Sequence, residues 1–423
     1  MVSSRVRTGL IATLSAFALL VSPDARAQIP NVGNCFLIPP YGGKNVIIMP
    51  GSTSLIPVVQ FLGAKLAQMT NPYLLVYFPM ASCDAMNRLN GTNYLGGTGQ
   101  FYTADPNDPT KIVTQSCSID GAAPIDLAVG DTFYETCGSG NRFASLGDFQ
   151  GPEQAFVFIT PRSFQYTTYI TDKEARVVFG CGAKGQVAPY LDDNFINSYS
   201  SAVGVQFGAQ LITGKAINLS VFDGANGNPS RAHLSDQDEA NDVARSTTPG
   251  QTIGFISAEV YDQMRDQLKA LAFRGIGQSA AYYPDSDSNS RDKRNVRDGH
   301  YTNQAPMHMW VALNPDGSIV RPLASKLINW MQGNPVAAGD QIPFDINDVY
   351  AQAGVVPKCA MKVSRSLDGG PFSPYVSEKM PCGCYFESKA TGKAVPPNCV
   401  QCTDSSGCNK GQICSYNFCE LAW

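Results

Sequence analysis

The stretch Val46–Ser54, which reads Val-Ile-Ile-Met-Pro-Gly-Ser-Thr-Ser, decides the fold class. Four apolar residues followed by Pro-Gly are typical of a buried strand that ends in a turn. Apolar residues then recur at helical spacing from Leu55 to Leu66. Pro57 falls in the first turn of this helix, where its missing N–H has no partner to lose. The stretch therefore predicts a strand, a tight turn and a helix in succession.

The same alternation continues along the chain. Further strands are expected at residues 73–78, 126–129, 155–160, 252–256 and 308–313, and helices near Ser82 and at 172–179, 258–268 and 322–331. The helix at 172–179 begins with the capping box Thr171-x-x-Glu174. Strands that alternate with helices predict an α/β fold with largely parallel sheets.

Small hydroxyl residues follow the first two strands, in the turns 51–54 and 81–84. At a helix N-terminus the unpaired backbone N–H groups and the helix dipole favour an anion, and hydroxyls add further donors. Two such turns at the carboxyl ends of neighbouring strands would converge on one crevice. Thr53, Ser54 and Ser82 are therefore candidate anion ligands. The alternative is that they only cap their helices, because Ser and Thr are preferred N-cap residues.

The N-terminus has the pattern of a cleaved secretory signal peptide. Two arginines precede a short apolar run, and Ala25-Arg26-Ala27 is a small-x-small cleavage site. No cysteine follows the site directly, so we expect neither a lipid anchor nor another membrane anchor. Loss of residues 1–27 takes the net charge from −4 to −6, which argues against nucleic acid as a partner. We expect a periplasmic or secreted protein.

Thirteen cysteines are divided unevenly along the chain. Five precede the midpoint, Cys35, Cys83, Cys117, Cys137 and Cys181, and eight lie near the C-terminus, Cys359, Cys382, Cys384, Cys399, Cys402, Cys408, Cys414 and Cys419. Export favours disulfides over zinc ligation, and a segment with so few apolar residues needs cross-links to hold together. All thirteen are disulfide candidates, and the pairing of the last eight stays open among 105 patterns.

Catalytic and metal-binding patterns are few. The chain has three histidines and no HExxH, GxSxG or P-loop motif. His300 and His308 could hold a metal together with Asp298, but they are better read as ordinary strand and loop residues. We expect no catalytic residue, no metal and no cofactor.

Seven segments, in this order, resemble the phosphate-type family of periplasmic solute-binding proteins. They are Pro50–Ser54, Tyr77–Met86, Ile125–Asp131, Gln154–Pro161, Ile170–Gly180, Gly250–Ser257 and the stretch from His300-Tyr301 onward. The resemblance covers about Asn45 to Gly333. It implies a two-lobed type II periplasmic-binding-protein fold, which the small disulfide-rich C-terminal segment would extend.

The resemblance also implies a domain organisation. Residues 1–27 would be the signal peptide, 28–160 and 275–355 the first lobe, 161–274 the second lobe, and 356–423 a linker and cysteine-rich module. The ligand would lie in the cleft between the lobes.

The second-lobe part of the anion site departs from the family pattern. Phosphate-binding members use an arginine followed by Ser-Gly-Thr, whereas the matching stretch here places Tyr199 at the arginine position and keeps only Gly204. The family's aspartate, which accepts the proton of bound phosphate, has no match within Leu95–Tyr102. Tyr199 and Gly204 are the second-lobe ligand candidates.

The implied function is that of a solute-binding protein for a small anion, with an ABC transporter permease or a cell-surface protein as partner. One alternative is a surface or interaction protein that has kept the fold without transport. The other is a secreted α/β hydrolase that would use Ser52 or Ser82.

Overall fold

The computed structural model describes residues 29–137, 145–181, 185–191, 233, 235–377 and 380–422. Eleven strands form one sheet in the order β1-β5-β4-β3-β2-β6-β11-β7-β10-β8, with β9 paired to β7. These strands are β1 (Asn31–Asn34), β2 (Val46–Ser52), β3 (Leu74–Met80), β4 (Tyr94–Asp105), β5 (Asp108–Pro124), β6 (Ala128–Gly130), β7 (Leu146–Pro161), β8 (Tyr169–Thr171), β9 (Gly254–Ser257), β10 (Leu268–Arg274) and β11 (Gln304–Ala312). The α-helices described are α1 (Ile56–Ala67), α2 (Ser82–Asn90), α3 (Asp172–Cys181), α5 (Asp236–Ala244), α6 (Ala258–Gln263), α7 (Arg294–Arg297), α8 (Pro322–Met331), α9 (Ile346–Ala353) and α10 (Gly383–Thr391).

The strand, turn and helix predicted from residue 46 onward are present as β2 and α1. Strand β2 runs parallel to β3 over its whole length and parallel to β6 at Gly51. Alternate residues of β2 and β3 belong to two different apolar clusters, so these strands are buried on both faces. Burial on both faces explains their continuous apolar sequence.

The prediction of largely parallel sheets is wrong. Strands β4 and β5 form a long antiparallel hairpin, and β7 pairs antiparallel with β9, β10 and β11. The hairpin needs only a short turn at 106–107, so it carries no crossover helix that would reveal it in the sequence. The α/β class itself is confirmed, and the sheet is mixed.

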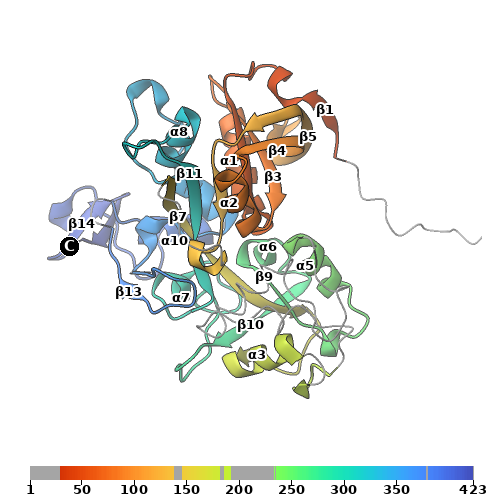
Figure 1. The fold of residues 1–423 in the computed structure, drawn as a ribbon. Coiled ribbons are helices and arrows are strands. Elements are labelled where there is room, and N and C mark those ends of the chain that lie inside the picture. Colours follow the sequence, from red (N-terminus) through yellow and green to blue (C-terminus); the bar gives the residue numbers. More distant parts are fainter. Residues whose placement is uncertain are drawn as a thin grey trace, which may run out of the picture.

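Strand β7 connects the two lobes of the fold. Its first part pairs with β11, and Phe156–Ile159 pair with β9. Figure 1 shows β7 passing from the lobe that holds β2, β3 and α1 to the lobe that holds β9, β10 and α3. Each lobe has its own apolar core, with β7 residues 155–159 in the core of the second. The crossing strand predicted at 155–160 is therefore present.

Two helix predictions have different outcomes. The capping box of α3 is confirmed, because the Thr171 N–H donates to Glu174 Oε2 at 2.8 Å and the Glu174 N–H donates to Thr171 Oγ1 at 3.1 Å. The helix predicted at 258–268 begins at Ala258 as predicted, but its predicted end is wrong, because α6 ends at Gln263 and Leu268 begins strand β10. Met264 and Leu268 lie four positions apart and are both buried in the second core, so their spacing resembles that of a helix.

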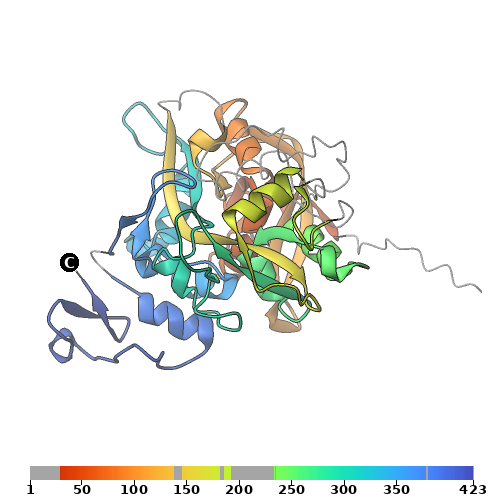
Figure 2. The ribbon, with the colours of Figure 1, turned by 90° about the horizontal axis from the view of Figure 1, so that it is seen from below.

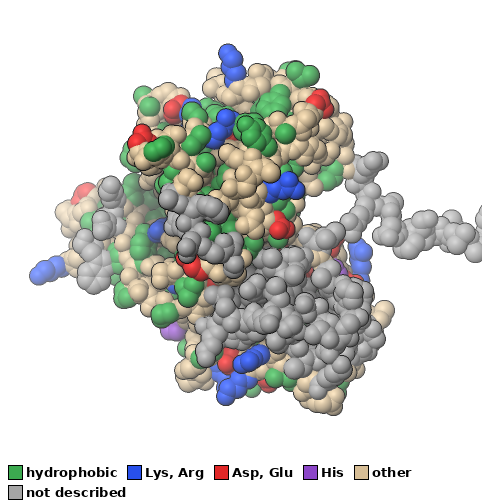
Figure 3. Space-filling model, in the orientation of Figure 1, with side chains coloured by type: hydrophobic (Ala, Val, Ile, Leu, Met, Phe, Trp, Pro, Cys, Tyr) green, Lys and Arg blue, Asp and Glu red, His purple; other side chains and the backbone are tan. Residues whose placement is uncertain are grey.

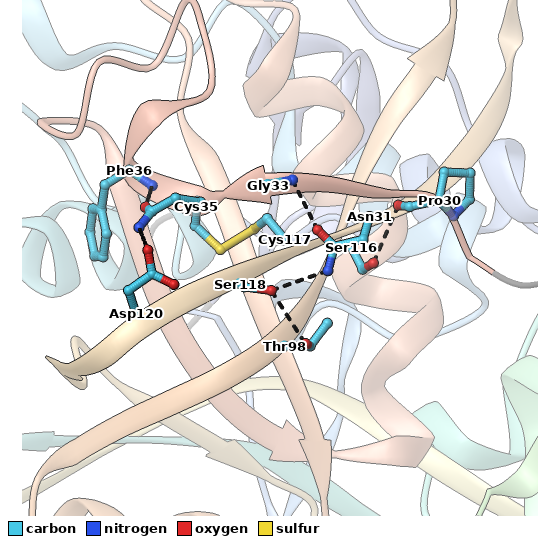
Figure 4. Close-up of a disulfide and its surroundings, with 11 residues drawn as sticks. Pro30, Asn31, Gly33, Cys35, Phe36, Thr98, Ser116, Cys117, Ser118 and Asp120 are labelled. Atoms are coloured by element: carbon cyan, nitrogen blue, oxygen red, sulfur yellow. Dashed lines mark hydrogen bonds between the residues drawn. A yellow bond between two sulfur atoms is a disulfide. The ribbon is translucent and has the colours of Figure 1, made fainter.

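Six disulfides cross-link the described residues, four of them within the C-terminal segment. Cys35–Cys117 joins the segment after β1 to β5, beside hydrogen bonds from Asn31 to Ser118 and from Asn34 to Asp120 (Figure 4). The other bonds are Cys83–Cys137, Cys359–Cys382, Cys384–Cys399, Cys402–Cys414 and Cys408–Cys419. Disulfide bonding is thus confirmed for twelve cysteines, and the Cys181 side chain lies outside the described residues.

The C-terminal segment is cross-linked and also packed against the second core. Phe386 of α10 and Cys382 are buried there, and the Glu153 N–H of β7 donates to the Val356 carbonyl at 2.7 Å. Figure 2 shows α10 and the hairpin of β14 (Gln412–Ser415) and β15 (Phe418–Leu421) at the periphery of the molecule. None of the described helices is long and apolar enough to cross a membrane.

Candidate functional site

Two strand-to-helix turns place serine hydroxyls at one edge of the sheet. Strand β2 ends at Ser52, a 3₁₀ turn at Thr53–Leu55 follows, and α1 begins at Ile56. Gly51 permits this turn to lie against β6, since a Cβ at Gly51 would stand 2.3 Å from the Val129 side chain. Ser52 and Ser54 are therefore fixed and buried at the carboxyl end of β2.

The second turn lies between β3 and α2. Ala81 is the N-cap residue of α2 and Ser82 is the first residue of the helix. Ser82 is 4 % exposed and does not cap the helix with its side chain. Its hydroxyl points instead toward the end of the neighbouring strand β6.

Three serine hydroxyls converge on one carboxylate, that of Asp131, directly after β6. Ser52 Oγ donates to Asp131 Oδ2 at 2.8 Å, and Ser54 Oγ donates to the same oxygen. Ser82 Oγ donates to Asp131 Oδ1 at 2.5 Å and accepts from the Asp131 N–H at 3.2 Å. Strands β2, β3 and β6 all end here, which is where parallel sheets bring ligand-binding groups together.

The candidate residues from the sequence have mixed outcomes. Ser54 and Ser82 are brought together as expected, and Ser52, considered only for a hydrolase, joins them. The half-buried Thr53 makes no side-chain hydrogen bond with the described residues. Tyr199 and Gly204 lie outside the described residues, so their predicted roles stay predictions.

Asp131 was missed by the sequence reasoning. The aspartate was sought in Leu95–Tyr102, which belongs to strand β4. The available signal was the end of the apolar segment 125–129, where Gly130-Asp131 follows a strand just as Gly51-Ser52 does. A search at the carboxyl end of every predicted parallel strand would have found Asp131.

A chain of hydrogen bonds leads from these serines into the interior. Gln154, which lies on β7 and is 0 % exposed, donates from Nε2 to the Ser54 carbonyl at 3.0 Å. The same Nε2 donates to Glu259 Oε2, on α6, at 3.2 Å. The connection thus joins the first-lobe turn, the crossing strand β7 and the second lobe.

Buried acids lie on the second-lobe side. Asp236 and Glu239, at the start of α5, accept from the N–H groups of Ser257 and Phe255 at 2.7 and 2.9 Å. Burial, together with the negative charge of Asp131, raises the pKa of Asp236 to about 7 despite the hydrogen bond from Ser257. Burial also raises the pKa of Glu239 well above its usual range. These carboxyls therefore carry less negative charge near neutral pH than their number suggests.

The arrangement does not fit the metal alternative. His308 pairs with Asp148 at 2.8 Å and His300 pairs with Asp298 at 2.7 Å, so the three proposed metal ligands do not converge. Among the described residues, the one close cluster of metal-type ligand atoms is Cys402, Cys408 and Cys419, which are all in disulfides. The site of three hydroxyls and a carboxylate is therefore a set of hydrogen-bonding groups suited to holding a ligand.

Charged side chains are scattered over the face of the molecule seen in Figure 3. Among the described residues of this face, Lys and Arg side chains form no continuous basic surface.

Comparison with known proteins finds similarity in fold but not in sequence. No known family model matches the chain, and no curated protein matches it. An ABC-type phosphate transport receptor from Vibrio cholerae is 14 % identical, with a TM-score of 0.45, and the match covers 73 % of this chain and 99 % of the receptor. A phosphate-binding protein from Stenotrophomonas maltophilia is 11 % identical, with a TM-score of 0.42 and coverage of 74 % and 90 %.

The reduced form of OxyR from Neisseria meningitidis also matches. It is 8 % identical, with a TM-score of 0.37, and the match covers 68 % of this chain and 94 % of that one. Phosphate-binding proteins are thus among the solved structures to which this chain is similar, at TM-scores below 0.5. Because proteins that share this fold differ in function, the ligand has to be inferred from the site itself.

Proposed function

We propose that this chain is a solute-binding protein for a small oxyanion that carries a proton, such as hydrogenphosphate. The observation that carries the proposal is the convergence of the Ser52, Ser54 and Ser82 hydroxyls on Asp131. The Asp131 carboxylate accepts the hydrogen bonds of these hydroxyls. A ligand could accept them in its place.

Asp131 would decide which oxyanion enters. A carboxylate accepts hydrogen bonds and repels a second negative charge at short range. A protonated oxyanion can donate to Asp131 while its other oxygens accept from the serines. A fully deprotonated anion such as sulfate has no proton to donate, so the Asp131 carboxylate would repel it without a compensating hydrogen bond. The site therefore favours phosphate or arsenate over sulfate.

The second lobe would close over the ligand. Strand β7 crosses between the lobes beside the site, and Gln154 on β7 bonds both the Ser54 turn and Glu259 of the second lobe. Hinge closure of two lobes about such a crossing is a known response to a ligand. Under this proposal the lobes are 28–160 with 275–355 and 161–274, Tyr199 and Gly204 supply second-lobe contacts, and 356–423 forms the cysteine-rich module.

Export is part of the proposal. The signal-peptide pattern of residues 1–27 and the six disulfides both suit an oxidising compartment. The protein would act in the periplasm or outside the cell, with an ABC transporter permease or a cell-surface protein as its partner. N-terminal sequencing of the exported protein tests this, and a mature chain that still carries residues 1–27 would contradict it.

The ligand is tested with the purified chain from residue 28. Native mass spectrometry reveals any anion that co-purifies, and thermal unfolding is followed with phosphate, arsenate, sulfate and organic acids. At a hundred times its Kd, a ligand stabilises the folded state by about 2.7 kcal/mol, which is several degrees in Tm. If no anion co-purifies and none raises Tm, the proposal fails.

Two variants assign the effect to the site. Ser82→Ala removes one hydrogen bond to a charged group and should weaken phosphate binding about tenfold. Asp131→Asn replaces the acceptor with an amide of the same shape and should reduce the preference for phosphate over sulfate. Ser318→Ala is the control, because the exposed Ser318 hydroxyl donates only within its own turn, to Asp316. Equal phosphate affinity in the Ser82 and Ser318 variants would place the ligand elsewhere.

A further inference from the structure

A cavity lies away from the serine cluster, where α1, α6, α9 and α10 meet. Its volume is about 290 Å³, near the lower end of the range for small-molecule pockets. Gly354 ends α9 with φ of +88°, and a Cβ there would lie 3.1 Å from Asp262, so glycine lets α9 approach α6 closely. Both the α/β lobes and the C-terminal segment contribute to the wall.

The polar wall contains a buried carboxyl with one unused oxygen. Glu259 is 1 % exposed, and its Oε2 accepts from Gln154, whereas its Oε1 has no hydrogen-bond partner. Burial raises the pKa of Glu259 well above its usual range, which favours the protonated carboxyl. A protonated carboxyl can donate a hydrogen bond, and an unpartnered buried polar group is costly. The cavity can supply the missing acceptor.

The rim of the cavity carries an unpaired positive charge. Lys293 pairs with Asp262 at 2.7 Å and Asp285 at 3.2 Å, and Arg265 pairs with the same two aspartates, so these four charges balance. Arg291 is exposed and donates to the Asp262 carbonyl at 3.0 Å, but no carboxylate of the described residues lies within ion-pair distance. One positive charge is therefore left over beside the cavity.

The remaining wall has an apolar part and a polar part. The apolar part is formed by Phe61 of α1, Ile112 of β5, Ala351 of α9, and Phe386 and Ala390 of α10, and the polar part includes Gln60, Gln263 and Gln352. An occupant thus meets an apolar surface together with the hydrogen-bonding groups of Arg291 and Glu259. The complementary molecule has an apolar body and one anionic acceptor group.

We propose that this cavity is an accessory binding site for a small organic monoanion, a monocarboxylate with an apolar body. The carboxylate would accept from the Arg291 guanidinium and from the Glu259 carboxyl, and the body would pack against Phe61 and Phe386. The site goes beyond the solute-binding function, because it shares no residue with the Ser52, Ser54, Ser82 and Asp131 cluster.

The probe for this site is 4-fluorobenzoate, followed by ligand-observed ¹⁹F NMR with the purified chain from residue 28. About ten non-hydrogen atoms in such a cavity should bind with a Kd of about 1 mM. The neutral analogue 4-fluorobenzyl alcohol should bind at least about fivefold more weakly, because it cannot pair with Arg291. Equal binding of the two probes would overturn the charge argument.

Variants locate the probe. Arg291→Ala should weaken 4-fluorobenzoate binding about tenfold, whereas Arg294→Ala, which removes a neighbouring exposed arginine outside the cavity, should leave it unchanged. Ser82→Ala should also leave it unchanged, whether or not the protein binds phosphate. Absence of binding, equal effects of the two arginine variants, or displacement of the probe by phosphate would each overturn the accessory site and would leave the serine site untouched.

Discussion

The Cys83–Cys137 disulfide should matter for the ligand site as well as for stability. Cys83 follows Ser82 in α2, and Cys137 ends the 3₁₀ turn Tyr134–Cys137, six residues after Asp131. The bond therefore ties the helix that carries one hydroxyl to the segment that carries the carboxylate. We predict that Cys83→Ala with Cys137→Ala destabilises the protein and also weakens phosphate binding.

The cost in stability follows from the loop that each disulfide closes. A separation of 54 residues for Cys83–Cys137 corresponds to about 4 kcal/mol of chain entropy in the unfolded state. Cys35–Cys117, with a separation of 82, corresponds to about 4.5 kcal/mol. Cys35–Cys117 joins the segment after β1 to β5, at the edge of the sheet far from Asp131. It is a matched control, because its loss should lower the free energy of unfolding by a similar amount and it does not contact the site.

The assay combines denaturant unfolding with calorimetric titration of phosphate on the oxidised proteins. Both double variants should lose similar unfolding free energy. Only the Cys83/Cys137 variant should lose phosphate affinity, by roughly tenfold, because the Ser82 hydrogen bond to the Asp131 carboxylate is no longer held in place. Hydrogen exchange of the α2 amides gives a readout that needs no ligand. Equal phosphate affinity together with equal α2 protection in the two variants would refute the reasoning.

Three further predictions concern single buried residues. Gln154→Ala should cost about 1–3 kcal/mol in chemical unfolding and weaken phosphate binding, because the Ser54 carbonyl loses its donor; unchanged affinity would contradict the hinge role. Between pH 4 and 7 Asp236 is ionised in the unfolded chain but protonated in the folded protein, so its contribution to stability is lost as pH rises. The folding constant should fall by up to about tenfold per pH unit in this window, and an unchanged slope in Asp236→Asn would refute the assignment. Lys293→Met should cost about 3–5 kcal/mol by unfolding titration, because it removes a buried partner of Asp262; a loss below 1 kcal/mol would contradict this.

The part of the fold that could be predicted is the part with local signals. Strand β2, the turn after it and helix α1 are encoded within about twenty consecutive residues, and the capping box of α3 within four. The hairpin of β4 and β5 was not predicted, since its strands are rich in Gly, Ser and Thr and lack an apolar run. Its stability comes from pairing with each other and with β3, which sequence periodicity does not report.

The residues of the site likewise divide into those with a local sequence signal and those that long-range pairing brings together. The serines could be proposed because each stands at a strand-to-helix turn, which is a local pattern. Asp131 has only a weak local signal, the Gly130-Asp131 pair at the end of an apolar segment, and its partners Ser52 and Ser82 lie 79 and 49 positions away. Only the parallel pairing of β2 with β3 and β6 brings the three segments together. The unused oxygen of Glu259 is likewise visible only in three dimensions.

The charge around the serine cluster depends on this long-range assembly. From the sequence, Asp131, Asp236 and Glu239 would count as three negative charges near a site proposed for an anion. Burial raises the pKa of Asp236 to about 7 and that of Glu239 well above its usual range, so both are largely uncharged in mildly acidic solution. Three hydroxyls, in contrast, donate hydrogen bonds to the Asp131 carboxylate. This arrangement suits a protonated oxyanion, because its O–H can donate to the Asp131 carboxylate while its other oxygens accept from the serine hydroxyls.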